Sequence, residues 1–174
     1  NLPITLGILL DTSGSEYDML SAEKEAATRF LGRVMRKGDL AMVMSFDTDV
    51  DLLADFPEAR SRLDRAINRA RINAPGSGAI IAQGPFPTSG SGGTNFYDAI
   101  YLAAHDKLAS EAGRKAIVIL TDAEDTGSKL KLQDAIETAQ RTDTVIHILL
   151  VSAYGGDQNV AKKITDETGG RMIV

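Results

Sequence analysis

The sequence contains no cysteine and no tryptophan. Without cysteine, the chain can form no disulfide, thiolate zinc site, iron–sulfur cluster or cysteine nucleophile. Its remaining aromatic residues are four Tyr and five Phe, and 19 Lys and Arg against 24 Asp and Glu leave a net charge of −5. A nucleic-acid-binding protein typically has a basic face with stacking rings, so we expect no nucleic-acid partner.

No stretch of the sequence is apolar enough to cross a bilayer, which takes about 18 residues. The longest candidate, Val145–Ala153, covers nine residues and includes His147 and Ser152. A chain of 174 residues that is 43% apolar can bury a core of its own. We therefore expect one domain over residues 1–174, monomeric by default. Because the sequence starts with Asn1 and ends in a strand-like segment, we also expect it to be a piece of a longer protein.

Apolar runs of strand length alternate with amphipathic stretches of helical length. The near-continuous apolar run Ile4–Leu10 is typical of a strand buried on both faces, and Glu16–Arg36 repeats apolar residues at helical spacing. The same patterns predict strands at Asp39–Phe46, Val50–Phe56, Lys115–Thr121, Thr144–Val151 and Arg171–Val174, and helices at Pro57–Ile72, Asn95–Ala109, Leu130–Arg141 and Gln158–Thr168. The short turn within Asp47–Asp49 predicts a hairpin. Strands that alternate with helices predict an α/β, doubly wound fold with a mostly parallel sheet.

One segment departs from this alternation. Asn73–Gly93 is rich in Gly, Pro and Ser and predicts a long irregular loop. It contains Ile80, Ile81 and Phe86, which either pack against the domain or form part of a recognition surface.

Five oxygen-bearing residues follow strands or precede a helix at one predicted edge of the sheet. Asp11, Ser13 and Ser15 follow the first strand, Thr94 precedes a helix, and Asp122 follows the strand Lys115–Thr121. In doubly wound sheets, ligands bind at the carboxyl ends of the strands. Hard oxygen donors suit Mg²⁺ or Mn²⁺, with Ca²⁺ less favoured, although Ser and Asp before a helix can also cap it. Two carboxylates balance the ion's charge, so the site would accept a carboxylate from outside.

These motifs resemble the metal-ion-dependent adhesion site (MIDAS) of von Willebrand factor type A (VWA) domains. The pattern D-x-S-x-S covers Asp11, Ser13 and Ser15, Gly-Gly-Thr ends at Thr94, and T-D ends at Asp122. The segments LGILLDTSGS, SFDTDV, GGTNFYDAIYLA, GRKAIVILTDAEDTGS and DETGGRMIV are most similar to the bacterial VWFA-related subfamily, whose members are often exported.

The resemblance implies a six-stranded sheet in the order 3-2-1-4-5-6, with one antiparallel edge strand and helices on both faces. It implies a metal site at the five residues, where Asp122 can act through a bridging water. It also implies a non-enzymatic, extracytoplasmic module in which the ion binds an Asp or Glu of a partner protein.

Two positions depart from the family pattern, and two more acidic residues lie near the site. Glu16 stands where many relatives carry Met, and Ala123 stands where Gly usually follows T-D. Glu16 either weakens the capture of an acidic ligand or occupies the open coordination position itself. We place Glu16, together with Glu124 and Asp125, at the rim that contacts a partner. Ala123 is strained only if its turn requires a positive φ.

Two other function classes remain open. In one, the ion mainly stabilises a structural or regulatory module within a larger assembly. The other is a metal-assisted hydrolase, with Glu124 as the base. The segment Asp11-Thr12-Ser13-Gly14 superficially resembles an aspartic-protease motif, but it has no second copy to supply the paired carboxylate. The residues therefore favour a binding module over an enzyme.

Overall fold

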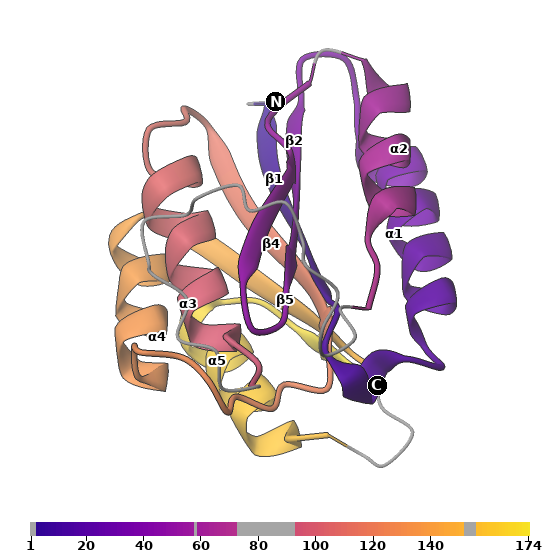
Figure 1. Ribbon diagram of the computed structural model, residues 1–174. Helices are drawn as coiled ribbons and strands as arrows, with labels where there is room; N and C mark the ends of the chain where they lie inside the picture. The colour runs from indigo at the N-terminus through magenta and orange to yellow at the C-terminus, as the bar shows by residue number, and fades with distance from the viewer. Residues whose placement is uncertain (1–2, 58, 73–92, 152–155) are drawn as a thin grey trace.

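The computed structural model describes residues 3–57, 59–72, 93–151 and 156–174 (Figure 1). In chain order, its elements are β1 (Ile4–Asp11), the 3-10 turn η1 (Gly14–Glu16), α1 (Leu20–Val34), β2 (Leu40–Phe46), β3 (Val50–Ala54), α2 (Arg60–Arg69), α3 (Phe96–Tyr101), the π-helical segment η2 (Leu102–Leu108), β4 (Arg114–Thr121), α4 (Leu132–Arg141), β5 (Thr144–Leu150), α5 (Gln158–Thr168) and β6 (Met172–Ile173).

The strands form one six-stranded sheet in the order β3-β2-β1-β4-β5-β6. Every neighbouring pair is parallel except β2 and β3, which form the antiparallel edge. This arrangement confirms the predicted α/β, doubly wound fold and the strand order implied by the family resemblance. The antiparallel hairpin is also confirmed, and its turn is closed by the Asp49 N–H, which donates to Asp47 Oδ1 at 3.0 Å.

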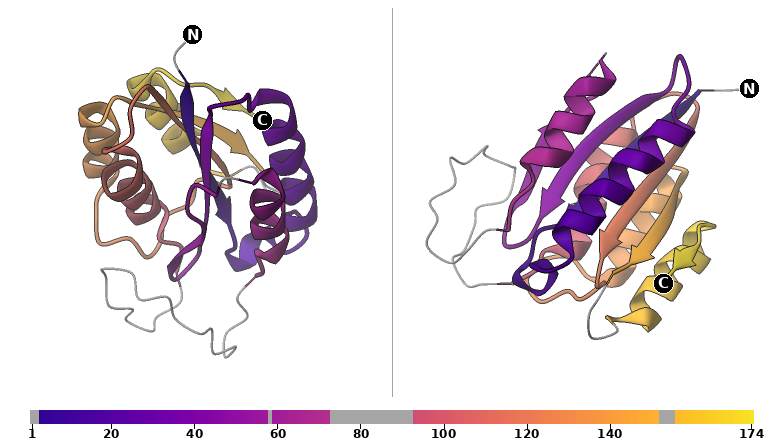
Figure 2. Two further views of the ribbon diagram at one scale, coloured as in Figure 1. Left: turned by 90° about the horizontal axis from the view of Figure 1, so that it is seen from above. Right: turned by 90° about the vertical axis from the view of Figure 1, so that its right-hand side faces the viewer.

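The sheet is covered on both faces, as its apolar strands require. Along β1, Leu9 packs into one hydrophobic cluster, whereas Ile8 and Leu10 pack into the other, because successive side chains of a strand point to opposite faces. Helices α1 and α2 cover the second cluster, and α3, η2, α4 and α5 cover the first (Figure 2). Strand β1 is therefore buried along almost its whole length, which holds its carboxyl end rigidly.

Most element boundaries differ from the sequence prediction by one to three residues, as in α2, which covers Arg60–Arg69 of the predicted Pro57–Ile72. The first helix begins at Leu20 instead of Glu16, because Gly14–Glu16 forms a separate 3-10 turn. The helix expected over Asn95–Ala109 is α-helical only to Tyr101 and π-helical beyond it, since both windings keep apolar residues on one face at similar spacing. The last strand, β6, is only two residues long. The predicted loop lies outside the described residues, apart from Gly93.

Candidate metal site

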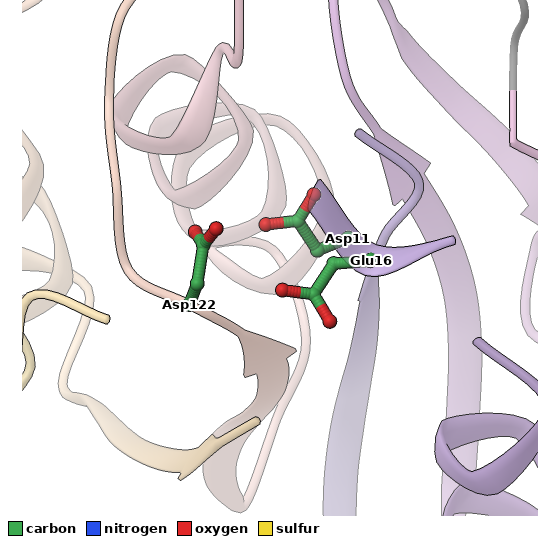
Figure 3. A group of neighbouring side chains, drawn as sticks. All are labelled: Asp11, Glu16 and Asp122. Carbon is green, nitrogen blue, oxygen red and sulfur yellow. The ribbon is translucent and has the colours of Figure 1, made fainter. Parts of the chain in front are cut away.

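Strands β1 and β4 bring two carboxylates to the same edge of the sheet. The two strands are parallel neighbours, and Leu10 of β1 pairs with Leu120 of β4. Asp11 is therefore placed beside the segment that carries Asp122, and the two are 0% and 4% exposed. In Figure 3 their side chains face a common space, into which Glu16 also points.

Asp11 is held by two hydrogen bonds from opposite sides. The Ser13 N–H donates to Asp11 Oδ1 at 2.9 Å, and the Thr121 hydroxyl donates to Asp11 Oδ2 at 2.6 Å. Burial raises the pKa of Asp11 to about 6, the hydrogen bonds from Ser13 and Thr121 lower it in part, and the charge of Asp122 raises it further. The carboxylate is therefore oriented, and its negative charge lacks a counter-charge of matching strength.

The two serines of the first motif lie side by side, Ser13 at the N-cap of η1 and Ser15 within it. Their hydroxyl oxygens are 2.9 Å apart. Ser13 occupies the N-cap position of η1, but its side chain makes no capping hydrogen bond. The capping interpretation of Ser13 therefore finds no support, and the paired hydroxyls remain candidates for metal ligands.

Thr94 lies on the segment that leads into α3, and hydrogen bonds to its backbone hold it in place. Its N–H donates to Thr126 Oγ1 at 2.9 Å, and its carbonyl accepts from the Thr126 and Gly127 N–H groups at 3.1 and 3.0 Å. The N-cap of α3 is Asn95, so Thr94 does not cap this helix. These hydrogen bonds fix the backbone of Thr94 to the segment that follows Asp122.

Asp47 ties the first and second motif segments together, a role that the sequence analysis did not assign. Its carboxylate accepts from the Thr12 hydroxyl at 2.9 Å, and its carbonyl accepts from the Asn95 N–H at 2.7 Å. Asp47 is 5% exposed although it begins a hairpin turn. The sequence signal was its place directly after a strand on the same edge as Asp11.

The turn after β4 positions Asp122. The Glu124 N–H donates to Asp122 Oδ1 at 3.0 Å, and the Asp157 N–H donates to the Asp122 carbonyl at 2.8 Å. Ala123 adopts a φ of 61°, so the condition for strain is met at this departure from the family pattern. The buried Ala123 N–H donates to Thr121 Oγ1 at 2.9 Å, which helps to hold the turn.

Glu16 and Glu23 form a second pair of buried carboxyl groups behind the first. They are 0% and 1% exposed, and within the described residues their four oxygens accept no hydrogen bond from an N–H or a hydroxyl, so each carboxyl group has only the other as a side-chain hydrogen-bond neighbour. Burial raises the pKa of both groups, and that of Glu23 rises further because Glu16 lies beside it. The structure thus buries Glu16, which the sequence analysis placed at the partner-contacting rim or in the open coordination position.

The other two residues assigned to the rim differ from each other. Glu124 is exposed. The carboxylate of Asp125 accepts from the Tyr97 N–H at 3.2 Å and from the Ser128 hydroxyl at 2.5 Å, so it links the start of α3 to the segment before α4. Glu124 remains available to a partner, whereas Asp125 already has a structural role.

The donor set fits a hard divalent cation. Asp11, Glu16 and Asp122 each offer one carboxylate oxygen, and these three atoms lie within 4.8 Å of one another. Bonds of about 2.1 Å to Mg²⁺ place opposite ligand oxygens about 4.2 Å apart, and bonds of about 2.4 Å to Ca²⁺ place them about 4.8 Å apart, so the spacing fits a hard divalent cation without selecting one. Within the described residues, the Glu16 oxygens accept no hydrogen bond from an N–H or a hydroxyl, so they are free to contact a cation.

Thr121→Val is expected to weaken the metal site with little change in shape. Valine removes the donor to Asp11 and the acceptor for the Ala123 N–H. Losing a hydrogen bond to a ligating carboxylate should lower metal affinity about 10- to 100-fold, measured by Mn²⁺ titration. Thr165→Val is the control, because the Thr165 hydroxyl is buried but bonds only to carbonyls of its own helix. Equal Mn²⁺ affinities in the two variants would contradict this role for Thr121.

Comparison with known proteins identifies the family. The model of the von Willebrand factor type A domain matches residues 6–125. Among curated proteins, no sequence matches the chain.

Solved structures share the fold at low sequence identity. An aerotolerance-related membrane protein of Bacteroides fragilis is 18% identical, with a TM-score of 0.71, and the match covers 98% of this chain and 90% of that one. A von Willebrand factor type A protein from Catenulispora acidiphila is 18% identical, with a TM-score of 0.75 and coverage of 99% and 39%. Proximal thread matrix protein 1 of the mussel byssus, with a zinc-occupied MIDAS motif, is 15% identical, with a TM-score of 0.72 and coverage of 98% and 41%. Since the family model matches more than half of its residues, the chain belongs to the von Willebrand factor type A domain family.

Proposed function

We propose that this domain is a divalent-cation-dependent protein-binding module. Asp11, Ser13, Ser15, Thr94 and Asp122 would hold Mg²⁺ or Mn²⁺, and the ion would bind an Asp or Glu side chain of a partner protein. The observation that carries this proposal is the convergence of buried carboxylates from β1, η1 and the end of β4 within 4.8 Å. The zinc-occupied MIDAS of the mussel protein supports metal binding at the corresponding place in a related fold.

The chemistry of the site favours binding over catalysis. The groups that converge are carboxylates and hydroxyls, which are the ligands that a hard cation prefers and which a bound ion would engage. We therefore propose a non-enzymatic role, with the ion supplying one strong, directional contact to the partner.

An extracytoplasmic location is part of this proposal. The Bacteroides fragilis relative is described as a membrane protein, which supports a role at the cell envelope. Within the described residues, none of the helices has both the length and the apolarity needed to span a bilayer.

A second candidate function follows from the depth of the site. Asp11 is fully buried, so a bound ion would neutralise charge inside the domain and could serve mainly to stabilise its fold. In that case, the ion would make no contact with a partner, and the domain would act as a structural or regulatory module of a larger assembly.

Thermal unfolding with and without metal tests whether the site binds an ion. Millimolar Mg²⁺ or Mn²⁺ should stabilise the wild type relative to chelator by about 2.7 kcal/mol when the ion is at 100 times its Kd. For a domain of this size, that corresponds to roughly 5–10 °C in Tm. Asp11→Ala should abolish the shift, because it removes a buried ligand. Glu124→Ala, which removes an exposed carboxylate at the same edge, should retain it.

Acetate separates the two candidate functions. For a binding module, acetate added to the Mn²⁺-loaded domain should bind the ion and change the relaxation of water protons. If metal does not raise the Tm of the wild type, metal binding is overturned altogether. If metal raises the Tm but acetate never changes the water-proton relaxation of the Mn²⁺-loaded domain, either in the wild type or in the Glu16 variants described below, the structural role is favoured.

A further inference from the structure

Glu16 is the least expected carboxylate of the site. It is fully buried, its oxygens accept no hydrogen bond from an N–H or a hydroxyl within the described residues, its side-chain hydrogen-bond neighbour is the carboxyl group of Glu23, and it points toward Asp11 and Asp122 (Figure 3). A buried carboxylate without an opposite charge is costly, and such groups are usually paired with a cation. No Lys or Arg is among the groups that influence its ionisation; those groups are Glu23, Asp11 and Asp122.

We propose that Glu16 is an internal ligand of the same ion and occupies the coordination position that a partner's carboxylate would take. The inference rests on the proposed function, since it requires that an ion binds at Asp11 and Asp122. In the isolated domain, Glu16 would therefore fill the last coordination position of the ion, and an acidic partner must displace Glu16 in order to bind.

The location of Glu16 in the chain supports this role. Glu16 ends η1, the turn that begins directly after Ser13 and contains Ser15. Its N–H donates to the Ser13 carbonyl at 3.0 Å, and its carbonyl accepts from the Met19 N–H at 3.0 Å. The backbone of Glu16 is therefore fixed to the segment that carries the two serines, so its side chain is presented to the ion together with theirs.

The charge balance explains why an outside carboxylate would compete. Asp11, Glu16 and Asp122 carry three negative charges, against two positive charges on the ion. A site that already has an excess negative charge gains less from another carboxylate than one with only Asp11 and Asp122. Displacing Glu16 restores neutrality before the partner adds its own charge.

Glu23 provides a matched comparison within the same cluster. It is also a buried glutamate whose oxygens accept no hydrogen bond from an N–H or a hydroxyl within the described residues, but it lies on α1. The group of mutually close ligand atoms comprises Asp11, Glu16 and Asp122, without Glu23. Glu16 and Glu23 therefore share burial but differ in their access to the ion, and the higher pKa of Glu23 favours its neutral form.

Replacing Glu16 tests the inference with Mn²⁺ as the probe. Glu16→Met removes every side-chain oxygen, and Glu16→Gln nearly preserves the shape. Both should fold, because they remove a buried carboxylate that is surrounded by Asp11, Asp122 and Glu23, and their Tm in chelator should be at least that of the wild type. Manganese affinity, measured from the free Mn²⁺ signal in electron paramagnetic resonance, should fall about tenfold or more in Glu16→Met.

Two further readouts separate a ligand from a residue that merely shapes the site. The number of water molecules bound to Mn²⁺, counted by hyperfine coupling in ¹⁷O-enriched water, should increase by one in Glu16→Met. Acetate should bind the Mn²⁺-loaded Glu16→Met domain about tenfold more tightly than the wild type. Glu23→Gln should leave both the water count and the acetate affinity at wild-type values.

The outcomes distinguish this inference from the proposed function. If the wild type binds Mn²⁺ through Asp11, but both Glu16 variants keep the wild-type water count and acetate affinity, the internal ligand is refuted and the metal site stands. If neither the wild type nor the Glu16 variants bind Mn²⁺, the proposed function fails, and the inference fails with it.

Discussion

Gly156→Ala is expected to destabilise the domain and to weaken metal binding at the same time. Gly156 has a φ of +54°, and a Cβ added there would lie 2.4 Å from the carbonyl oxygen of Asp122. The left-handed backbone alone costs an L-residue about 1–2 kcal/mol. The clash adds to this cost by pushing the Asp122 backbone away, so we expect a total of about 2–3 kcal/mol. Denaturant unfolding in chelator measures this loss.

The displacement of Asp122 should appear separately in the metal affinity. Since Asp122 is a proposed ligand, Mn²⁺ should bind Gly156→Ala about tenfold or more weakly than the wild type. Gly169→Ala is the matched control, because Gly169 has a φ of +79° but an added Cβ there meets nothing within 4 Å. It should lose stability through backbone strain alone and keep its Mn²⁺ affinity. Equal affinities in the two variants would argue against Asp122 as a ligand.

The stabilisation by metal is expected to fall sharply between pH 7 and pH 5. Burial raises the pKa of Asp11 to about 6, from an ordinary value of 3.8. Below this pKa the ion must displace a proton from Asp11, so the apparent metal affinity should decrease about tenfold for each pH unit. The difference in Tm between Mn²⁺ and chelator, recorded from pH 5 to pH 8, measures this effect.

In the metal-free domain, the contribution of Asp11 to stability should change with pH in the opposite direction. Because the pKa of Asp11 is higher in the folded state than in the unfolded state, the folded state binds more protons between about pH 4 and pH 6. The contribution of Asp11 to stability is therefore lost as the pH rises through this range, by an amount on the order of 3 kcal/mol. The two Tm curves should separate as the pH increases. Asp11→Asn should remove the separation, and parallel curves in the wild type would contradict the assignment of Asp11.

The order of the elements could be predicted because each strand and helix has a distinct apolar period. The run Ile4–Leu10 is almost continuously apolar, and the structure buries β1 between two layers of helices. Boundaries were less predictable. The helix expected from Glu16 begins at Leu20, because residues 14–16 form a separate 3-10 turn. The helical spacing of apolar residues does not reveal this turn.

The candidate site was only partly readable from the sequence. The motif residues Asp11 and Asp122 follow adjacent strands, so topology alone predicts that they approach each other. The burial of Glu16 and Glu23 was missed, because charged residues are normally assigned to a solvated face. A signal was present in α1, since Leu20, Glu23, Ala27 and Leu31 fall on one buried face at helical spacing. A glutamate on the apolar face of a helix, such as Glu23, is therefore a candidate member of a buried polar site.

The roles of Thr121 and Asp47, which hold the site residues in place, could not be predicted for a different reason. Thr121 and Asp47 act through hydrogen bonds that depend on the pairing of distant segments, as in the bond from Thr12 to Asp47. Local patterns of polarity carry no information about such pairs. Their roles emerge only when the strands are placed in register.

The candidate ligands come from segments far apart in the chain, and this has a consequence for folding kinetics. The hydroxyl of Thr121 bonds to Asp11 across 110 residues of sequence, and the N–H of Asn95, before α3, bonds to the carbonyl of Asp47, after β2. An ion can be held only after β1, β4 and the start of α3 have docked, which is late in folding because long-range contacts form slowly. Interactions that are absent from the folding transition state act on the unfolding rate. A bound ion would therefore slow unfolding and prolong the lifetime of the folded state, and it would not speed folding.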